Sequence, residues 1–342
     1  MFGLLAVLTF SQNLHAWSER GHDLITRVAV QKMRADSADL RLLQPFLLRD
    51  HMLAHLSNTP DTVWVADYMS DEAKSLNSAT QFIKLEKIID GVERWDDFPR
   101  DFVKYEYFCK SRGFETSEIG TAPWRVLQFY KLVVNELRNL DAKPKLIRER
   151  HINQALTYAG LMAHFVGKLA NPQYTTENQD GQLTGNAGLR EYFDSMVVSE
   201  LSFRLPQKIL RKSKKRRLWL RNYSRSERAE ILSDPQKLVW ALVANSHNDM
   251  DALLRLDNRH SIKSKSDVQD NYSTSAERKP ASRAARRYEK FVVKRMAIGA
   301  EALSRLWTLA WQDAGSPDMS GYQSSYYSLQ PPFITPSYIE QN

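Results

Sequence analysis

The fold class is decided by one stretch, residues 152–174, which reads INQALTYAGLMAHFVGKLANPQY. Its apolar residues recur at intervals of three and four, which is the period of an α-helix. They are Ile152, Ala155, Leu156, Ala159, Met162, Ala163 and Val166. Leu161 and Phe165 add a second apolar side, and Asn171-Pro172 ends the pattern. The stretch therefore predicts a central helix that is buried on more than one side.

Further helical patterns lie before and after this helix. They cover residues 21–33, 121–133, 234–256 and 284–314. Thr121 and Pro123 suit a helix start, and Gly315 suits a helix end. The alternation of polar and apolar residues that marks a strand is nowhere sustained. The sequence therefore predicts an all-α fold with one multi-helix domain over residues 17–315.

Four segments depart from helical periodicity. Residues 1–16 contain a short apolar run that ends at Ala16, which is typical of a signal peptide; a buried N-terminal helix is the alternative. Residues 173–188 are polar and glycine-rich, which predicts an irregular surface loop. Residues 261–282 are rich in Ser and Lys and predict a mobile insertion. Residues 316–342 contain several prolines and predict an extended tail.

Composition narrows the class of protein. The chain has 342 residues, a formal net charge of +8 and a single cysteine, Cys109. One cysteine excludes an internal disulfide and a thiolate metal cluster. The positive charge suits an anionic ligand, single-stranded nucleic acid or a phospholipid surface. We expect a periplasmic or secreted monomer without a membrane-spanning segment once the signal peptide is removed.

A basic run at residues 211–217 reads RKSKKRR and could contact phosphate groups. Such a run is more often a solvated face of a helix, and we prefer that interpretation.

Potential metal ligands occur near the N-terminus. If cleavage follows Ala16, Trp17 offers its free amine and its carbonyl oxygen as a chelate. His22 lies five residues later, at the start of a helix, where it could share an ion with that terminus. Asp61 occupies a turn-like approach to a helix in the sequence NTPDTVW, residues 58–64.

Two further pairs have helical spacing. His164 and Lys168 are four residues apart and share one face of the central helix. Arg190 and Asp194 have the same spacing just after the polar loop. Taken singly, a histidine such as His164 is more often a core or surface residue than a metal ligand. The order of all these residues along the chain is therefore the informative feature.

That order resembles the zinc-dependent phospholipase C and S-one/P-one-type single-strand nuclease superfamily. Residues 16–22, AWSERGH, are similar to the mature start of these proteins. Residues 164–174 resemble the segment in which His, Asp and His occupy the first, fifth and eleventh places. Residues 180–182 and 188–194 resemble the Asp-Gly loop and the His-x-x-x-Asp/Glu helix that follow. The match runs from Trp17 to Asp194, and the last third of the chain adds only compatible helices.

The resemblance implies the fold of this superfamily and three zinc ions at nine ligand positions. Five of these positions keep a residue that could bind zinc: Trp17, His22, Asp61, His164 and Asp194. Four carry a replacement: Gln81, Lys168, Tyr174 and Arg190. Gln81 stands where residues 80–85 resemble the His-Phe-Ile-Asp segment of the family. Each of the three ions would lose at least one ligand, and no catalytic residue is assigned beyond the family position Asp61.

The replacements conflict with zinc chemistry. Clustered Zn²⁺ ions activate a water molecule and hold phosphate oxygens, and they need neutral or anionic ligands. A cation about 4 Å from Zn²⁺ would cost roughly 8 kcal/mol at an effective dielectric constant of about 20. Structural zinc sites bind with only about 10–16 kcal/mol. Because unpaired buried carboxylates are costly, we expect Lys168 to pair with Asp61 and Arg190 to pair with Asp194.

Three functions remain open at this stage. The first is an exported pseudoenzyme that keeps the cleft, loses the hydrolytic metals and binds an anionic ligand or a protein. The second is an active zinc-dependent phosphodiester hydrolase, a nuclease or phospholipase C, that works with a reduced metal site. The third is an interaction module that uses the basic run and the insertion at residues 261–282.

Overall fold

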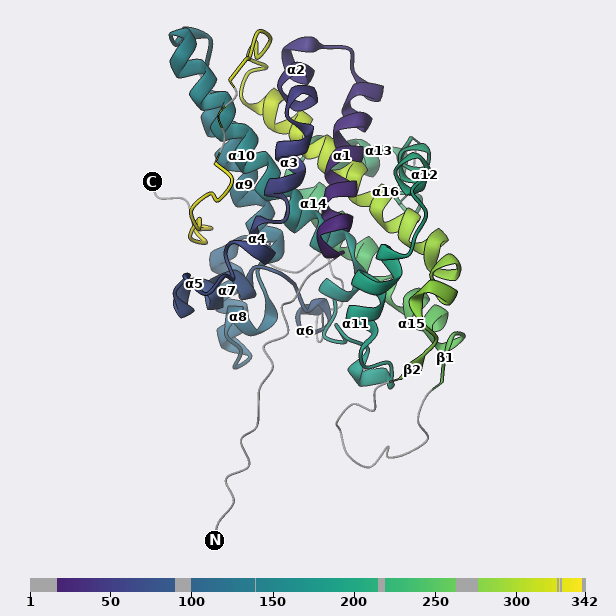
Figure 1. Ribbon diagram of the computed structural model, residues 1–342. Helices are drawn as coiled ribbons and strands as arrows, with labels where there is room; N and C mark the ends of the chain where they lie inside the picture. The colour runs from purple at the N-terminus through teal and green to yellow at the C-terminus, as the bar shows by residue number, and fades with distance from the viewer. Residues whose placement is uncertain are drawn as a thin grey trace.

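The computed structural model describes residues 17–89, 100–138, 140–214, 219–262, 276–324, 326 and 328–339. The predicted signal peptide, residues 1–16, lies outside these residues. The described chain is mainly helical and forms a multi-helix bundle, as Figure 1 shows. The all-α fold class is therefore confirmed.

The first half of the chain contains three longer helices, one at its start and two at its end, with several short helices between them. Its elements are α1 (Ser18–Asp36), α2 (Leu40–Leu48), α3 (Asp50–Leu56), α4 (Thr59–Thr62), α5 (Asp71–Ala79), α6 (Leu85–Ile89), α7 (Phe102–Ser111), α8 (Thr116–Ile119), α9 (Ala122–Leu137), η2 (Leu140–Ala142) and α10 (Lys145–Ala170).

The second half begins with short turns and ends in one very long helix. Its elements are η3 (Pro172–Tyr174), η4 (Gln182–Thr184), α11 (Leu189–Glu191), the π-helical turn η5 (Tyr192–Val197), α12 (Leu205–Ser213), α13 (Arg225–Ser233), α14 (Pro235–His247), α15 (Met250–Asn258), β1 (Ser261–Ile262), β2 (Glu277–Arg278) and α16 (Ala281–Asp313).

The helix α10 is the centre of the fold, as its sequence predicted. Every residue from Ala159 to Ala170 is buried, and the helix packs against α9, α16 and α3. Gly160 lets α3 approach closely: a Cβ atom there would lie 2.7 Å from Cβ of Leu56. Different sides of α10 thus pack on different helices, which explains the second apolar side in its sequence.

The helices α1 and α16 pack against each other and against α10. The apolar face of α1, which includes Ile25, faces this core. Gly299 of α16 lies so close to Ala170 that an added Cβ would be 2.9 Å from its side chain. Gly315 follows the end of α16 with a φ of 93°, which is the left-handed conformation expected at this position.

The helix predicted over residues 234–256 is two helices, α14 and α15, with a break at Asn248 and Asp249. The break turns Asp249 toward α16. There its carboxylate accepts hydrogen bonds from Lys294 and from the buried Arg295, each 2.7 Å long at Oδ2. The ion pairs of Asp249 therefore coincide with a break in a segment whose sequence pattern predicts one continuous helix.

The polar loop at residues 173–188 is irregular, as predicted, but much of it is buried and not on the surface. Its polar groups bind one another and the rest of the protein. Asn186 donates to Asp257, 2.6 Å away, and Asp257 also accepts from Arg278 and Tyr288. Composition predicted exposure here because it does not show that amide and hydroxyl groups can satisfy each other inside a protein.

The ends of the predicted insertion at residues 261–282 are ordered: β1 and β2 form a two-residue antiparallel ladder, and Ala281 already begins α16. Residues 263–275 lie outside the described residues. The tail after Ser316 has no helix or strand where it is described, and it binds the helical core. The indole of Trp64 donates to the carbonyl oxygen of Pro331, 3.1 Å away. Among the described helices, none combines the length and the apolar character needed to cross a membrane.

Candidate functional site

Three helices bring potential metal ligands together inside the molecule. The helix α1 carries His22, α4 carries Asp61 and α10 carries His164. One ligand atom of each side chain lies within 4.8 Å of the other two, and all three residues are buried. Two imidazole nitrogens and a carboxylate oxygen are common metal ligands, so this group could hold one metal ion.

Packing fixes His22 beside His164. The two rings stack with their centroids 4.4 Å apart and their planes at 20°. Gly167 makes room for this arrangement, because a Cβ atom there would lie 2.8 Å from Nδ1 of His22. The sequence analysis did not single out Gly167. A glycine within a strongly apolar helix was the signal that could have indicated a close approach.

Trp17 adjoins the same part of α10. Its buried indole donates a hydrogen bond of 2.9 Å to the carbonyl oxygen of Gly167, and its ring packs on Phe193 at 5.5 Å. Its own carbonyl oxygen accepts the first hydrogen bond of α1, from the amide of Gly21 at 2.8 Å. The structure thus shows the Trp17 side chain as an anchor between α1 and α10.

A chain of hydrogen bonds runs through His164. Its Nδ1 lies 2.9 Å from the carbonyl oxygen of Ser57, and its Nε2 lies 2.7 Å from Oε1 of Gln81. Nε2 of Gln81 donates to the side-chain oxygen of Asn77 at 3.0 Å and to its backbone oxygen at 3.3 Å. Asn77 in turn donates to the carbonyl oxygen of Pro60 at 2.8 Å. The chain therefore ends on a backbone carbonyl at both sides.

These carbonyl ends determine the direction of every hydrogen bond in the chain, since a carbonyl oxygen only accepts. The amide nitrogen of Gln81 must face Asn77, so its oxygen faces His164. Nδ1 of His164 therefore donates to Ser57, and its Nε2 faces the oxygen of Gln81 and lies 3.6 Å from Oδ1 of Asp61. A ring nitrogen that donates a hydrogen bond has no lone pair for a metal ion.

Lys168 binds the remaining oxygen of the same carboxylate. Its Nζ lies 3.0 Å from Oδ2 of Asp61, and the side chain is fully buried. The ammonium group also lies over the ring of Tyr174, 4.5 Å from its centroid. Burial lowers the pKa of Lys168, while the charge of Asp61 and its hydrogen bond oppose that shift. The ion pair expected between Lys168 and Asp61 is confirmed.

Asp194 is held by neutral donors. Asn171 donates to its Oδ1, and the hydroxyl of Tyr174 donates to its Oδ2 at 3.3 Å. Burial raises the pKa of Asp194 to about 7, although the charges of Lys168 and Arg190 and the hydrogen bond from Asn171 lower it. Tyr174, one of the four positions at which the sequence predicted a replaced ligand, thus donates a hydrogen bond to Asp194.

The ion pair expected between Arg190 and Asp194 is not formed, although the structure describes both residues. Residues Tyr192–Val197 form a π-helical turn, in which hydrogen bonds span five residues, so the i, i+4 spacing no longer aligns the two side chains. The backbone amide of Arg190 donates to Asp180 at 2.9 Å. Arg190 acts on Asp194 only through its more distant charge.

Eight of the nine positions named from the sequence thus converge, and Arg190 lies at their edge. Three further residues of the site were not predicted from the sequence: Ser57, Asn77 and Asn171, which bind His164, Gln81 and Asp194. Asn77 precedes Gln81 by one helical turn, which is the only sequence signal for its role. The other two depend on contacts between distant segments or on backbone atoms.

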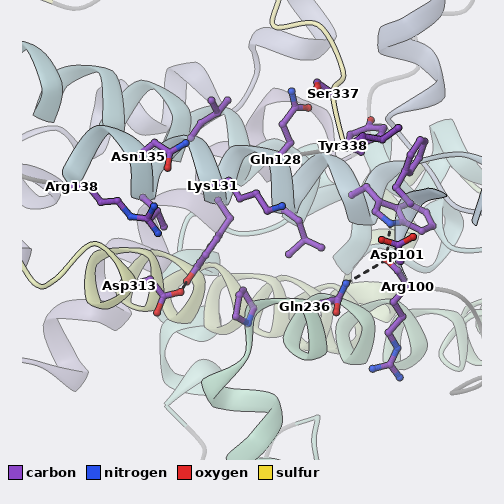
Figure 2. Close-up of a pocket in the computed structure, with 18 residues that line it drawn as sticks. Arg100, Asp101, Gln128, Lys131, Asn135, Arg138, Gln236, Asp313, Ser337 and Tyr338 are labelled. Atoms are coloured by element: carbon purple, nitrogen blue, oxygen red, sulfur yellow. Dashed lines mark hydrogen bonds between the residues drawn. The ribbon is translucent and has the colours of Figure 1, made fainter. Parts of the chain in front are cut away.

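A separate cavity of about 840 Å³ lies between α9, the start of α14 and the tail, and Figure 2 shows the residues around it. It is lined by Trp124, Lys131, Arg138 and Tyr338, among others. The hydroxyl of Tyr130 donates across it to Asp313 at 2.6 Å. None of the nine positions lines this cavity, so it is distinct from the buried cluster.

No protein-family model, curated protein or solved structure matches this chain. The superfamily resemblance across residues 17–194 therefore remains a prediction from the sequence.

Proposed function

We propose that the chain is an exported, catalytically inactive relative of zinc-dependent phosphodiesterases whose metal site is closed by its own side chains. One observation carries this proposal: ligand atoms of Asp61 and His164 are already bound within the protein. Lys168 holds Asp61 at 3.0 Å, and Gln81 holds Nε2 of His164 at 2.7 Å. The function then depends on binding an anionic ligand or a protein, and not on hydrolysis.

The energies favour the closed arrangement. A zinc ion at the cluster would lie near the Lys168 ammonium group, and at about 4 Å the repulsion would be roughly 8 kcal/mol. Moving Lys168 away would break a buried ion pair, which costs about 3–5 kcal/mol. The other replaced positions do not offset this repulsion. Gln81, Tyr174 and Arg190 stand where the family has zinc ligands, and they do not supply the anionic or histidine ligands of the family. Net zinc affinity is therefore small.

A second candidate is a hydrolase with a single metal ion on His22, Asp61 and His164. The convergence of these three ligand atoms within 4.8 Å favours it. If this candidate is correct, the ring of His164 gives up a proton and Gln81 turns away when zinc binds. The zinc content of the purified protein distinguishes the two candidates.

The test uses the mature chain purified without chelators. The wild-type protein should contain close to no zinc and should not hydrolyse bis(p-nitrophenyl) phosphate when zinc is added. The double variant Gln81→His/Lys168→Asp removes the competing cation and restores two family ligands, so it should bind zinc measurably. Lys145→Asp, at an exposed position on the same helix, is the matched control and should behave like wild type.

Stoichiometric zinc in the wild-type protein, or zinc-dependent hydrolysis by it, would contradict the proposal. A double variant that stays folded and still binds no zinc would show that Gln81 and Lys168 are not what closes the site.

A further inference from the structure

A surface depression of about 350 Å³ lies between α15 and α16, away from the buried cluster. Its lining contains five cationic residues and no acidic residue. They are Arg255, Arg259, Arg287, Lys290 and Lys294. Lys294 is paired with Asp249, but Arg255, Arg259 and Lys290 are exposed to solvent.

Two more depressions, of about 460 and 500 Å³, continue this surface across α16 and along α12. One of them shares Lys290 with the first depression. They add five cationic residues: Arg204, Lys208, Arg211, Lys212 and Arg286. The acidic residue in their lining is Glu289, which binds Lys208 at 2.6 Å. We call the residues that line the three depressions the basic face.

The basic face holds most of the charge asymmetry of the protein. Its ten cationic residues stand against one acidic residue, whereas the whole chain has a net charge of +8. The rest of the chain is therefore close to neutral. Figure 1 shows α12 and α15 near the N-terminal half of α16, so the charge is gathered on one side of the molecule. A concentrated positive surface attracts anionic partners such as nucleic acid or a membrane.

An apolar side chain stands at the end of the basic face. Phe203 is 80% exposed and lines the third depression, and the guanidinium of the neighbouring Arg204 lies 5.6 Å from its ring centroid. The amphipathic helix α12 follows, with Leu205 and Ile209 buried and Lys208 and Arg211 directed to the basic face. An exposed aromatic residue beside an amphipathic basic helix is typical of proteins that bind at the surface of a bilayer.

We propose that the basic face is a docking surface for an anionic lipid membrane. The cationic side chains contact acidic head groups, and Phe203 enters the boundary between head groups and acyl chains. Neighbouring depressions share Lys290, Lys208 and Arg211, so the three form one basic surface on three helices that suits several head groups side by side. The exposed ring of Phe203 at its end favours a bilayer over a strand of nucleic acid. The docking surface does not involve the buried cluster, so it stands independently of the metal content of the site.

The test measures co-sedimentation with vesicles of equal parts phosphatidylglycerol and phosphatidylcholine, compared with phosphatidylcholine alone. The wild-type protein should bind only the acidic vesicles. Raising the salt concentration from about 0.1 to about 1 M should abolish binding, since the screening length falls from about 10 to about 3 Å. Each basic residue near such a membrane contributes about 1 kcal/mol, so Arg211→Glu/Arg286→Glu/Lys290→Glu should weaken binding at least roughly a hundredfold.

The matched control is Lys143→Glu/Lys145→Glu/Arg150→Glu, which makes the same change in net charge at exposed residues near the start of α10. It should bind like wild type. The single variant Phe203→Ser should bind roughly tenfold more weakly, because the ring no longer enters the membrane. All variants are checked for folding by thermal denaturation. Phe203→Ser alters an exposed side chain, so it still tests the proposal if a triple variant unfolds.

Equal loss of binding in both triple variants would contradict the proposal, since net charge alone would then explain it. Failure of the wild-type protein to bind acidic vesicles would also overturn it, as would tighter binding to a single-stranded oligonucleotide than to the vesicles.

Discussion

The buried polar groups of Asp61, His164 and Gln81 are bound by particular neighbours, and these contacts decide what the site can do. Lys168 and the ring of His164 both contact Asp61, while Gln81 contacts His164. Lys168 and His164 thus share one carboxylate, and burial raises the pKa of the nearby Asp194 to about 7. A site balanced in this way by protein charges gains little from a metal cation.

Removing Lys168 tests this charge balance. Lys168→Ala leaves Asp61 buried with one cationic partner fewer, and we expect the free energy of unfolding to fall by about 3–5 kcal/mol. The double variant Asp61→Asn/Lys168→Met removes both charges and should be clearly more stable than Lys168→Ala. Urea denaturation of the three proteins measures both differences. If Lys168→Ala is as stable as wild type, the ion pair does not hold the site closed.

At the residue scale the superfamily resemblance placed Lys168 and Asp61 in one site, and the need of a buried carboxylate for a cation then predicted their pairing. It did not predict that Gln81 would bind His164, although both positions were named. Which way a side chain points depends on the backbone atoms around it, here the carbonyl oxygens of Ser57 and Asn77. Such contacts leave no pattern in the sequence.

At the scale of elements, glycine positions bring the helices close enough for the cluster to form. Gly160 brings α10 against α3, and Gly167 brings it against His22 of α1. Because α10 carries both His164 and Lys168, its position relative to α1 and α4 sets the distances in the site.

Gly160→Ala distinguishes packing from helix propensity. Propensity alone predicts a gain of up to about 1 kcal/mol, because alanine favours a helix over glycine. The contact with Leu56 predicts the opposite sign, a loss of about 1–3 kcal/mol, because the added methyl group overpacks the interface of α10 with α3. Thermal or urea denaturation gives the sign directly. A more stable variant would show that α3 moves aside at little cost.

The interface of α1 with α16 contains a partly buried acid, Glu301. Burial raises its pKa to about 7, opposed by the charge of Lys32. Above pH 4.5 the unfolded carboxyl group ionises while the folded one keeps its proton, so folding stability falls as the pH rises from about 4.5 to 7. Glu301→Gln lacks this loss and should gain roughly 2.5 kcal/mol on wild type between pH 5 and pH 8.

The control for Glu301→Gln is Glu200→Gln at an exposed position, which should show no pH-dependent difference from wild type. Unfolding free energies at several pH values measure both variants. A constant difference between Glu301→Gln and wild type would mean that Glu301 is ionised in the folded protein throughout this range.

Helices were predicted correctly from the sequence where the apolar periodicity was long, and incorrectly where tertiary contacts changed the backbone. The central helix and the last helix follow their periodicity closely. The break at Asp249 and the π-helical turn at residues 192–197 do not, since ion pairs and packing produce them. The buried polar loop at residues 173–188 was misplaced because polar composition is compatible with either exposure or mutual hydrogen bonding.

At the scale of the whole molecule, the protein separates a neutralised interior from a charged exterior. The cluster of His164, Lys168, Asp61 and Asp194 balances its own charges inside the bundle. The basic face holds the surplus on α12, α15 and α16. The net charge of +8 was visible in the sequence, but its concentration on one face depends on residues that are far apart in the chain. Residues 215–217 of the predicted basic run lie outside the described residues.

The most direct test of a closed metal site is the zinc content of the chain from Trp17 onward, purified without chelators and measured by elemental analysis. We expect close to zero zinc per chain, because Lys168 and Gln81 bind ligand atoms of Asp61 and His164 that zinc would need. One zinc ion per chain would instead establish the single-ion site of His22, Asp61 and His164. Two or three ions would contradict the account entirely.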